Sequence, residues 1–272
     1  MKSMYFISGA TGGLGKAFTV ECASRGWDLF LTDLQSEKLA ALAGGLENAY
    51  EINVRSQACD LTDVNARSAL LDSLRSRGLR FRGLINVAGL DYEGLFLEKS
   101  REQIRNILRL NIEATLEITH TLLDLTDPIT PFRIITISSL AAFYPMPVKA
   151  TYAASKRFLL DFFLALRDEV GEHGATVTVL CPAGLPTTEE CIQAIEAQGL
   201  MGQLTTQDIG KVAAQTVEAA LRGRALVIPG ILNQALHQLG GLLPPSSLVK
   251  LIGKRWRTAH RRRLEIAVPT RA

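Results

Sequence analysis

Short apolar runs alternate along the chain with segments in which apolar residues recur every three or four positions. Residues Met4–Ser8 are apolar and are followed by glycine, which is typical of a buried strand, and residues 13–25 have the spacing of a helix that stops at Gly26. The predicted strands are 4–8, 28–33, part of 51–61, 84–87, 132–138, 176–181 and 225–228, and the predicted helices are 13–25, 36–43, 63–77, 102–125, 152–172 and 208–222.

This rhythm predicts βαβ units and therefore an α/β fold: a doubly wound Rossmann-type parallel β-sheet flanked by helices on both faces, with a C-terminal helical extension. No internal repeat or linker divides the chain, so we expect one domain whose main part is residues 1–230. Residues 231–272 form a basic, helical extension of the same domain. Residues 184–207 are a long connection that does not follow this alternation of strands and helices, and we expect them to form a flap over the substrate.

Composition excludes several classes of protein. The chain has 272 residues, of which 47% are hydrophobic and 21% are charged, as in an ordinary globular protein. No apolar stretch approaches the roughly 18 residues that a membrane span needs. The four cysteines show no CxxC pair and no histidines at ligand spacing, so we expect no metal site and a reducing, cytoplasmic location.

Positive charge gathers at the C-terminus. Residues 247–272 hold eight Lys and Arg and one acid, whereas residues 1–246 hold 22 basic and 26 acidic residues, so no nucleic-acid partner is expected for the body. The tail has apolar residues at helical spacing (Leu248, Ile252, Trp256 and Ala259). We expect this stripe to pack on the body or on a second subunit, with 229–259 ordered and the residues after Leu264 frayed. Contact with an anionic membrane surface and docking of an acidic partner are the less favoured alternatives.

The first predicted turn is rich in glycine. It contains Ser8, Gly9, Thr11, Gly13, Leu14 and Gly15, and it joins a predicted strand to a predicted helix. Glycines let a pyrophosphate approach the backbone, and the helix N-terminus then offers free N–H groups to its charge. The turn therefore predicts dinucleotide binding, and a glycine-rich turn without a ligand is the alternative.

Asp33 ends the second predicted strand, 18 residues after Gly15. An acidic residue at about this spacing accepts hydrogen bonds from the adenosine ribose, and its charge repels a 2′-phosphate. No Lys or Arg within 10–14 or 34–36 offsets that repulsion. The predicted cofactor is therefore NAD rather than NADP, and capping of the next helix is the alternative role of Asp33.

The spacing Gly9-x-x-x-Gly13-x-Gly15 resembles the fingerprint of the short-chain dehydrogenase/reductase family. Further segments over about residues 3–230 resemble that family in the same order: Asp60-Leu61, Asn86 with Ala88 and Gly89, Asn111, Ser139, Tyr152-x-x-x-Lys156, and Pro182 with Thr187. The resemblance implies that the residues of these segments other than Asn111 and Ser139 bind the cofactor. The departures are Ser8 for Thr, Val87 for the second Asn and Ala183 for Gly.

Tyr152 and Lys156 are four residues apart in a predicted helix and therefore share one face. A nearby ammonium favours the phenolate and lowers the pKa of a tyrosine, which makes it usable as a base. The resemblance implies that Tyr152 exchanges the proton with the substrate, that Lys156 lowers its pKa and holds the nicotinamide ribose, that Ser139 binds the substrate oxygen, and that Asn111 supports a water relay.

The substrate pocket of such a fold lies beyond the carboxyl ends of the strands. The segments expected there, 90–96, 140–147 and the flap, are mostly apolar and suit a hydrophobic alcohol or ketone. We therefore expect an oxidoreductase that interconverts a secondary alcohol and a ketone on a hydroxysteroid-like or other bulky substrate, working as a homodimer or homotetramer. A carrier-linked 3-oxoacyl reductase and a non-catalytic NAD-binding regulatory or scaffold protein are the alternatives.

Overall fold

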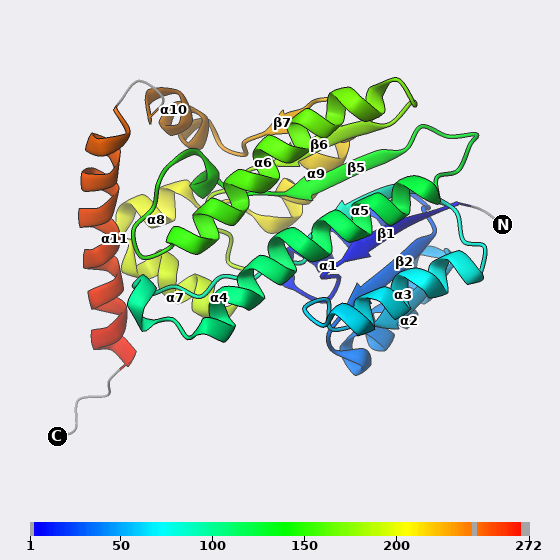
Figure 1. The fold of residues 1–272 in the computed structure, drawn as a ribbon, viewed down its shortest axis with the longest axis horizontal. Helices are drawn as coiled ribbons and strands as arrows, with labels where there is room; N and C mark the ends of the chain where they lie inside the picture. Colours follow the sequence, from blue (N-terminus) through cyan, green and yellow to red (C-terminus); the bar gives the residue numbers. More distant parts are fainter. Residues whose placement is uncertain (1–2, 241–243, 268–272) are drawn as a thin grey trace.

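Seven parallel strands form the centre of the molecule. The computed structural model describes residues 3–240 and 244–267, and it orders the strands β3-β2-β1-β4-β5-β6-β7 (Figure 1). The strands are β1 (Met4–Ser8), β2 (Leu29–Asp33), β3 (Val54–Ala58), β4 (Phe81–Asn86), β5 (Arg133–Ile137), β6 (Thr176–Leu180) and β7 (Leu226–Val227). The predicted doubly wound α/β fold is confirmed.

The strand order reverses between β1 and β4. The chain builds outward from β1 to β3 and then returns to pair β4 with the other side of β1. In an open parallel sheet, such a reversal leaves a crevice at the carboxyl ends of the strands, where ligands bind. Ser8 at the end of β1 and Asn86 at the end of β4 are paired in register there.

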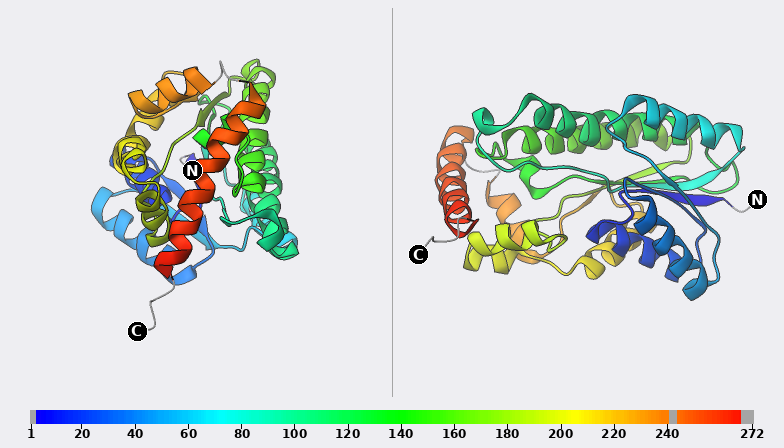
Figure 2. Two further views of the ribbon diagram at one scale, coloured as in Figure 1. Left: turned by 90° about the vertical axis from the view of Figure 1, so that its left-hand side faces the viewer. Right: turned by 90° about the horizontal axis from the view of Figure 1, so that it is seen from below.

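Helices cover both faces of the sheet, as the view from below in Figure 2 shows. One buried cluster joins the sheet to α3 (Val64–Ser76), α5 (Thr115–Asp124) and α6 (Ala150–Gly171). The other joins it to α1 (Gly13–Ser24), α2 (Ser36–Tyr50) and α9 (Ile209–Leu221). Both faces of central strands such as β1 and β4 are therefore apolar, in agreement with the continuous hydrophobic runs of the sequence.

Packing moves the limits of several predicted elements. Helix α2 continues through Gly44 and Gly45 to Tyr50, so the predicted stop at residue 43 is wrong. Leu46, one turn beyond Ala43, is buried in the same core, and this burial outweighs the low helix propensity of two glycines. Strand β4 also begins earlier than predicted, at Phe81, because Phe81 is fully buried between other core residues.

The predicted helix 102–125 is not regular along its length. It consists of α4 (Arg101–Leu108), a π-helical turn (Arg109–Ala114) and α5. Asn111 lies in the π-helical turn and is completely buried. Such wide turns inside helices often occur at functional sites, because they change the direction in which a side chain points.

The remaining elements surround the carboxyl ends of the strands. The flap contains α7 (Glu189–Ala197) and α8 (Leu200–Thr205), and short 3-10 turns lie at Phe96–Glu98 and Leu140–Phe143. The C-terminal extension forms α10 (Ile231–Gly240) and α11 (Pro245–Ala267). No helix among the described residues is long and apolar enough to cross a membrane.

Helix α11 crosses the end of the molecule between the two helical layers, as both views in Figure 2 show. Its Leu248 and Ala259 are buried, as expected for a stripe that packs on the body. A hydrogen bond of 3.3 Å from Arg255 to Gln198 connects it to the end of the flap helix α7. The helix continues to Ala267, so the prediction of fraying directly after Leu264 is wrong, and the tail 268–272 lies outside the described residues.

Candidate active site

The glycine turn after β1 is fixed by close backbone contacts. Gly9 has a φ of +66°, and a Cβ atom there would lie 2.7 Å from the backbone nitrogen of Ala88. A Cβ at Gly15 would lie 1.9 Å from the carbonyl oxygen of Gly9. The Ser8 hydroxyl accepts a hydrogen bond of 3.3 Å from Ala88 N and so ties the turn to the end of β4. Only glycine allows this close approach of the β1 and β4 loops.

Thr187 of the flap lies against the N-terminus of α1. A Cβ at Gly13 would come within 2.9 Å of the Thr187 Cα and carbonyl oxygen. Leu14, next to Gly13, is buried in the core, and the Pro182 carbonyl accepts a 2.8 Å hydrogen bond from Leu140 N. The Thr187 backbone therefore packs directly on Gly13, and no side chain caps the N-terminus of α1, so its N–H groups suit the pyrophosphate of a dinucleotide.

The carboxylate of Asp33 is joined to this turn. Its Oδ2 accepts a hydrogen bond of 2.8 Å from Thr11 N, and its Oδ1 accepts one of 2.7 Å from Leu34 N. A carboxylate has about four acceptor positions, so two bonds leave capacity for the hydroxyls of a ribose. The site therefore fits a dinucleotide at the ribose as well as at the pyrophosphate.

The residues expected near adenine and beside β4 are held differently. Asp60 is exposed, and its Oδ1 accepts hydrogen bonds from Thr62 N at 2.8 Å and Thr62 Oγ1 at 2.7 Å. Leu61 is buried in the core. The Asn86 amide donates to Thr119 at 3.1 Å and to Thr136 at 3.4 Å, so its side chain joins β4 to α5 and β5. Contact of these residues with the cofactor stays a prediction.

Tyr152 and Lys156 occupy the first two turns of α6, on one face as predicted. The Lys156 Nζ lies 5.7 Å from the centroid of the Tyr152 ring and donates a hydrogen bond of 2.8 Å to the Ile137 carbonyl. Ser139 shares a side-chain hydrogen bond with Tyr152. The sequence segments around residues 139, 152 and 156 are therefore brought together at the carboxyl ends of β5 and β6.

The protonation of this cluster differs from the sequence-based expectation. Burial raises the pKa of Tyr152 to about 12, the Asp91 carboxylate adds to the rise, and Lys149 and the Ser139 hydrogen bond lower it. Burial lowers the pKa of Lys156 to about 8. In the protein alone, Lys149 is thus a cation beside Tyr152 that favours its phenolate and that the sequence analysis did not identify.

Asn111 connects the loop after β4 to helix α6. Its Oδ1 accepts a 2.8 Å hydrogen bond from Leu90 N, and its Nδ2 donates to the Leu90 carbonyl at 3.0 Å and to Ser155 Oγ at 2.9 Å. Gly89 keeps the space beside it open, since a Cβ there would lie 3.1 Å from the Lys156 Nζ and 3.5 Å from the Asn111 Oδ1. Asn111 thus lies next to Lys156, and its role in a water relay stays a prediction.

Sequence reasoning missed a group of charged residues beside Tyr152. Lys149 forms ion pairs with Asp91 at 2.6 Å and with Glu93 at 3.2 Å, and its Nζ lies 5.0 Å from the centroid of the Trp256 ring in α11. His260, which showed no partner pattern in the sequence, lies 3.9 Å from Glu93. These residues come from three separate segments, and no local spacing connects them.

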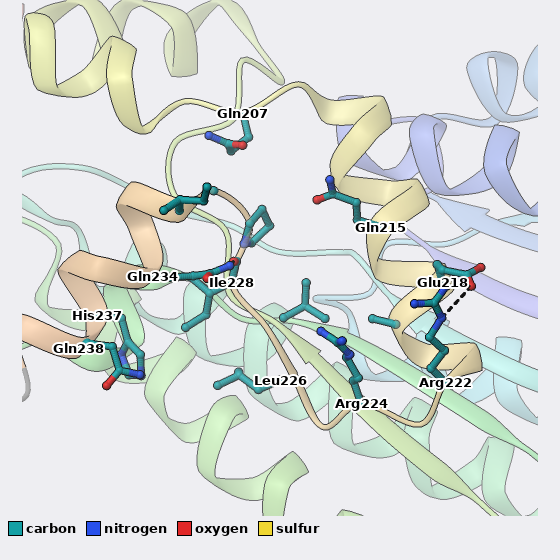
Figure 3. A pocket seen from close by; sticks show the side chains of 15 residues that line it. Gln207, Gln215, Glu218, Arg222, Arg224, Leu226, Ile228, Gln234, His237 and Gln238 are labelled. Carbon is teal, nitrogen blue, oxygen red and sulfur yellow. Dashed lines mark hydrogen bonds and ion pairs between the residues drawn. The ribbon is translucent and has the colours of Figure 1, made fainter.

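A large pocket lies away from this cluster. It has a volume of about 930 Å³ and lies between α9, β7 and α10 (Figure 3). Glutamines are prominent in its lining: Gln207, Gln215, Gln234 and Gln238. His237 also lines it and packs against Phe143 with the two rings tilted and their centroids 4.0 Å apart. The pocket is lined by neither Tyr152 nor Lys156, so the catalytic assignment depends on the clustered side chains and not on this cavity.

Known proteins share both the sequence pattern and the fold. A very-long-chain 3-oxoacyl-CoA reductase of Laccaria bicolor is 30% identical over 175 residues, which are 63% of this chain and 51% of that protein. The chain therefore spans about half the length of this relative. A sulfoacetaldehyde reductase of Chromohalobacter salexigens is 32% identical over 191 residues, which are 70% of this chain and 74% of that protein.

Solved structures support the fold alone, because their sequence identities are low. A 7beta-hydroxysteroid dehydrogenase has a TM-score of 0.80 at 21% identity, and the match covers 92% of this chain and 96% of the other. A bulky-bulky ketone specific alcohol dehydrogenase from Comamonas testosteroni has a TM-score of 0.72 at 21% identity, over 89% and 95% of the two chains. The model of the short chain dehydrogenase family matches residues 3–196, and the chain belongs to this family of oxidoreductases.

Proposed function

We propose that the protein is an NAD(H)-dependent oxidoreductase that interconverts a secondary alcohol and a ketone on a bulky hydrophobic substrate. The observation that carries this proposal is the cluster of Ser139, Tyr152 and Lys156 at the carboxyl ends of β5 and β6. A phenol beside a hydroxyl and an ammonium can hold a substrate oxygen and exchange its proton.

Each residue of the cluster has a distinct part in alcohol oxidation. The Ser139 hydroxyl holds the substrate oxygen, and the Tyr152 oxygen takes the proton of the substrate hydroxyl as the carbonyl forms. A nicotinamide cofactor, which the glycine turn, Asp33 and Lys156 would hold, would supply the acceptor for the hydride of the carbinol carbon. In the reverse direction Tyr152 returns the proton to the oxygen of the new alcohol. Lys156, four residues further along the same helix face, would hold the nicotinamide ribose and, while charged, favours the Tyr152 phenolate.

Asp33 supports NAD over NADP. Its carboxylate is held at the glycine turn by Thr11 N, where a 2′-phosphate would meet a negative charge. Structures of similar fold include one in complex with NADPH and one in complex with NAD, so the fold itself does not decide the cofactor. The preference proposed for this chain therefore depends on Asp33.

Exposed apolar side chains support a hydrophobic substrate. Phe96 and Leu97, in the segment after β4, are 60% and 94% exposed, and Leu200 at the start of α8 is 70% exposed. Gly94 N donates a 3.1 Å hydrogen bond to the Val148 carbonyl, which places this segment beside the start of α6. We propose that these side chains contact the apolar part of the substrate.

The experiment is a substrate panel that contains hydroxysteroids, bulky aryl and alkyl secondary alcohols, short aliphatic alcohols and 3-hydroxyacyl thioesters, each with NAD and with NADP. We expect NADH formation with bulky alcohols. Tyr152→Phe removes only the phenol oxygen, so NAD binding is expected to persist while kcat falls by a factor on the order of 10² to 10⁴. Near-normal kcat in Tyr152→Phe would contradict the proposed chemistry.

A 3-oxoacyl thioester reductase is the second candidate, since relatives are named very-long-chain 3-oxoacyl-CoA reductases and the outer residues of α11, such as Lys250 and Lys254, are basic and exposed. Faster turnover of 3-oxoacyl thioesters than of free ketones would favour it. Tight NAD binding without turnover of any substrate class would instead favour a regulatory protein.

A further inference from the structure

The side chain of Lys149 lies between two aromatic rings. Its Nζ is 5.7 Å from the centroid of the Tyr152 ring and 5.0 Å from the centroid of the Trp256 ring. Both distances are within the range of cation–π attraction. Lys149 directly precedes α6, whereas Trp256 belongs to α11, which crosses the end of the molecule (Figure 2). The C-terminal helix therefore contributes a wall to the surroundings of Tyr152.

Carboxylates hold the Lys149 ammonium in place. Asp91 Oδ2 lies 2.6 Å from Nζ and Glu93 Oε2 lies 3.2 Å from it. Burial opposes the charge of Lys149, but the attraction of Asp91 and Glu93 outweighs burial and raises the pKa of Lys149. The ammonium therefore stays charged throughout the working range of an enzyme.

The backbone beside Lys149 is also constrained. Val148 has a φ of +74°, which is an unusual conformation for a β-branched residue. Its carbonyl accepts hydrogen bonds from Gly94 N at 3.1 Å and from Lys99 Nζ at 3.3 Å. Strained backbone of this kind persists where surrounding contacts over-determine it, and it clusters at functional sites.

Lys156 offers a contrast on the same ring. Its Nζ is also 5.7 Å from the centroid of the Tyr152 ring, but burial lowers the pKa of Lys156 to about 8. Its charge is therefore lost as the pH rises through about 8, whereas the charge of Lys149 persists. Tyr152 thus has one cation whose charge is permanent and one whose charge titrates near its working pH.

We propose that Lys149 is a positioning residue for catalysis: Asp91 and Trp256 hold its ammonium over Tyr152, where it favours the phenolate that accepts the substrate proton. Lys149 touches no reacting atom and acts through Tyr152, so the proposal rests on the role proposed above for Tyr152. It also gives the C-terminal helix a function, because Trp256 is the residue that closes over the ammonium from α11.

The charged groups around Tyr152 predict opposite changes in its pKa for two substitutions. Five groups face Tyr152: Asp91 after β4, Ser139 after β5, Lys149 and Lys156 at α6, and Cys191 in α7. A second layer of charged or titratable side chains lies behind Lys149 and consists of Glu93, Glu98, Lys99 and His260. Loss of the Lys149 charge removes a cation that lowers the pKa of Tyr152, and loss of the Asp91 charge removes an anion that raises it. The two substitutions must therefore move the pKa of Tyr152 in opposite directions.

The test is the pH profile of kcat/KM for alcohol oxidation from pH 6 to pH 10.5, at saturating NAD, whose positively charged nicotinamide ring would lower the Tyr152 pKa into this range. For Lys149→Met we expect the rising limb to move about one pH unit higher, which is about a tenfold lower rate at a fixed pH below the midpoint. Lys149→Arg keeps the charge and should restore most of the shift. Asp91→Asn keeps an oxygen that can accept from Lys149 and should move the limb to lower pH.

Three further variants separate electrostatics from packing. Trp256→Phe keeps an aromatic face for the ammonium and should retain the wild-type midpoint more closely than Trp256→Leu. Arg157→Met removes an exposed cation of the same helix, paired with Asp161, and serves as the matched control with an unchanged midpoint. Thermal unfolding and NAD binding are recorded for each variant. If Lys149→Met does not fold, Lys149→Gln takes its place.

The proposal is overturned if the Lys149→Met or Lys149→Gln profile superimposes on the wild-type profile, or if the Lys149 and Asp91 variants shift in the same direction. Tyr152→Phe distinguishes this failure from failure of the proposed function. Loss of turnover in Tyr152→Phe with a wild-type profile in the Lys149 variants overturns only the role of Lys149. Retained turnover in Tyr152→Phe overturns the role of Tyr152 itself.

Discussion

The backbone N–H of Thr11 donates a hydrogen bond of 2.8 Å to the carboxylate of Asp33 and so joins the glycine turn after β1 to the end of β2. The bond fixes the negative charge of Asp33 where a ribose would lie against the turn. It also satisfies a backbone donor of the turn, so Asp33 has a structural role in addition to its proposed contact with the ribose.

Cofactor preference should change when this charge is removed. Asp33→Ala with Leu34→Arg removes the anion that repels a 2′-phosphate and supplies a cation that pairs with it, so kcat/KM should shift from NAD toward NADP. Asp33→Asn is the matched control, because it keeps an acceptor for Thr11 N while losing the charge. A wild-type enzyme that already prefers NADP tenfold would contradict the assignment.

The stability of the protein should rise when Lys156 loses its charge. Lys156 is 3% exposed and burial lowers its pKa to about 8, so below pH 8 the folded protein holds a buried ammonium that the unfolded chain leaves in water. This cost is fully present below pH 8 and fades as the pH rises from about 8 to the ordinary lysine pKa, because there the unfolded chain binds the additional proton.

Lys156→Met is therefore expected to raise the free energy of unfolding at pH 7 by on the order of 1–3 kcal/mol, and the gain should shrink above pH 8. Urea unfolding at pH 7 and pH 9.5 measures both values. The same variant should lose turnover and bind NAD more weakly. Equal or lower stability at pH 7 would show that the Ile137 hydrogen bond outweighs burial of the charge.

The sequence identified the residues whose roles depend on a local turn or on one helix face. Gly9, Gly13 and Gly15 were recognisable because a single turn needs them. Tyr152 and Lys156 were recognisable because a spacing of four residues places two side chains on the same face of a helix. The alternation of strand and helix patterns was therefore sufficient to predict the parallel sheet, and the spacing of four residues to predict that Tyr152 and Lys156 lie together.

Long-range contacts were not visible in the same way. Lys149 meets Trp256 only because α11 returns across the carboxyl ends of the strands, and the buried Leu46 carries α2 past two glycines. Similarly, the π-helical turn at Asn111 follows from its bonds to Leu90 and Ser155 on two other segments. Tertiary packing determined each of these features, and no periodicity along the chain reports it.

The network around Arg67 should respond unequally to loss of its partners. Arg67 in α3 is fully buried and donates to Glu117 at 2.6 Å, to Glu113 at 2.8 Å and to the Leu61 carbonyl at 2.7 Å. The carboxylates of Glu117 and Glu113 are 39% and 43% exposed, so water can solvate them when the arginine is absent. The guanidinium of Arg67 is fully buried, so water cannot solvate it when the carboxylates are absent.

Removal of both carboxylates (Glu113→Gln with Glu117→Gln) should thus cost about 3–5 kcal/mol, as expected for an uncompensated buried charge. Arg67→Met should cost less, about 1–3 kcal/mol, mainly for the unsatisfied Leu61 carbonyl and lost packing. Urea unfolding of the variants gives the comparison. A larger loss in Arg67→Met than in the double variant would contradict this account of the network.

Helix α11 should remain bound to the body in the presence of anionic liposomes. Leu248 and Ala259 are buried, and Gly253 packs so closely that a Cβ there would lie 3.0 Å from the Pro147 Cγ. The apolar stripe is therefore occupied, and insertion into a bilayer would require its release from the protein. Exposed cations such as Lys250 and Lys254 add about 1 kcal/mol each near anionic lipid, but salt screens this attraction.

We expect little co-flotation of the protein with anionic liposomes at physiological salt. Gly253→Val should push α11 away from Pro147, expose the stripe and increase co-flotation, whereas Lys250→Gln, on the outer surface of the same helix, should not. Strong co-flotation of the wild-type protein at physiological salt would contradict this account of α11.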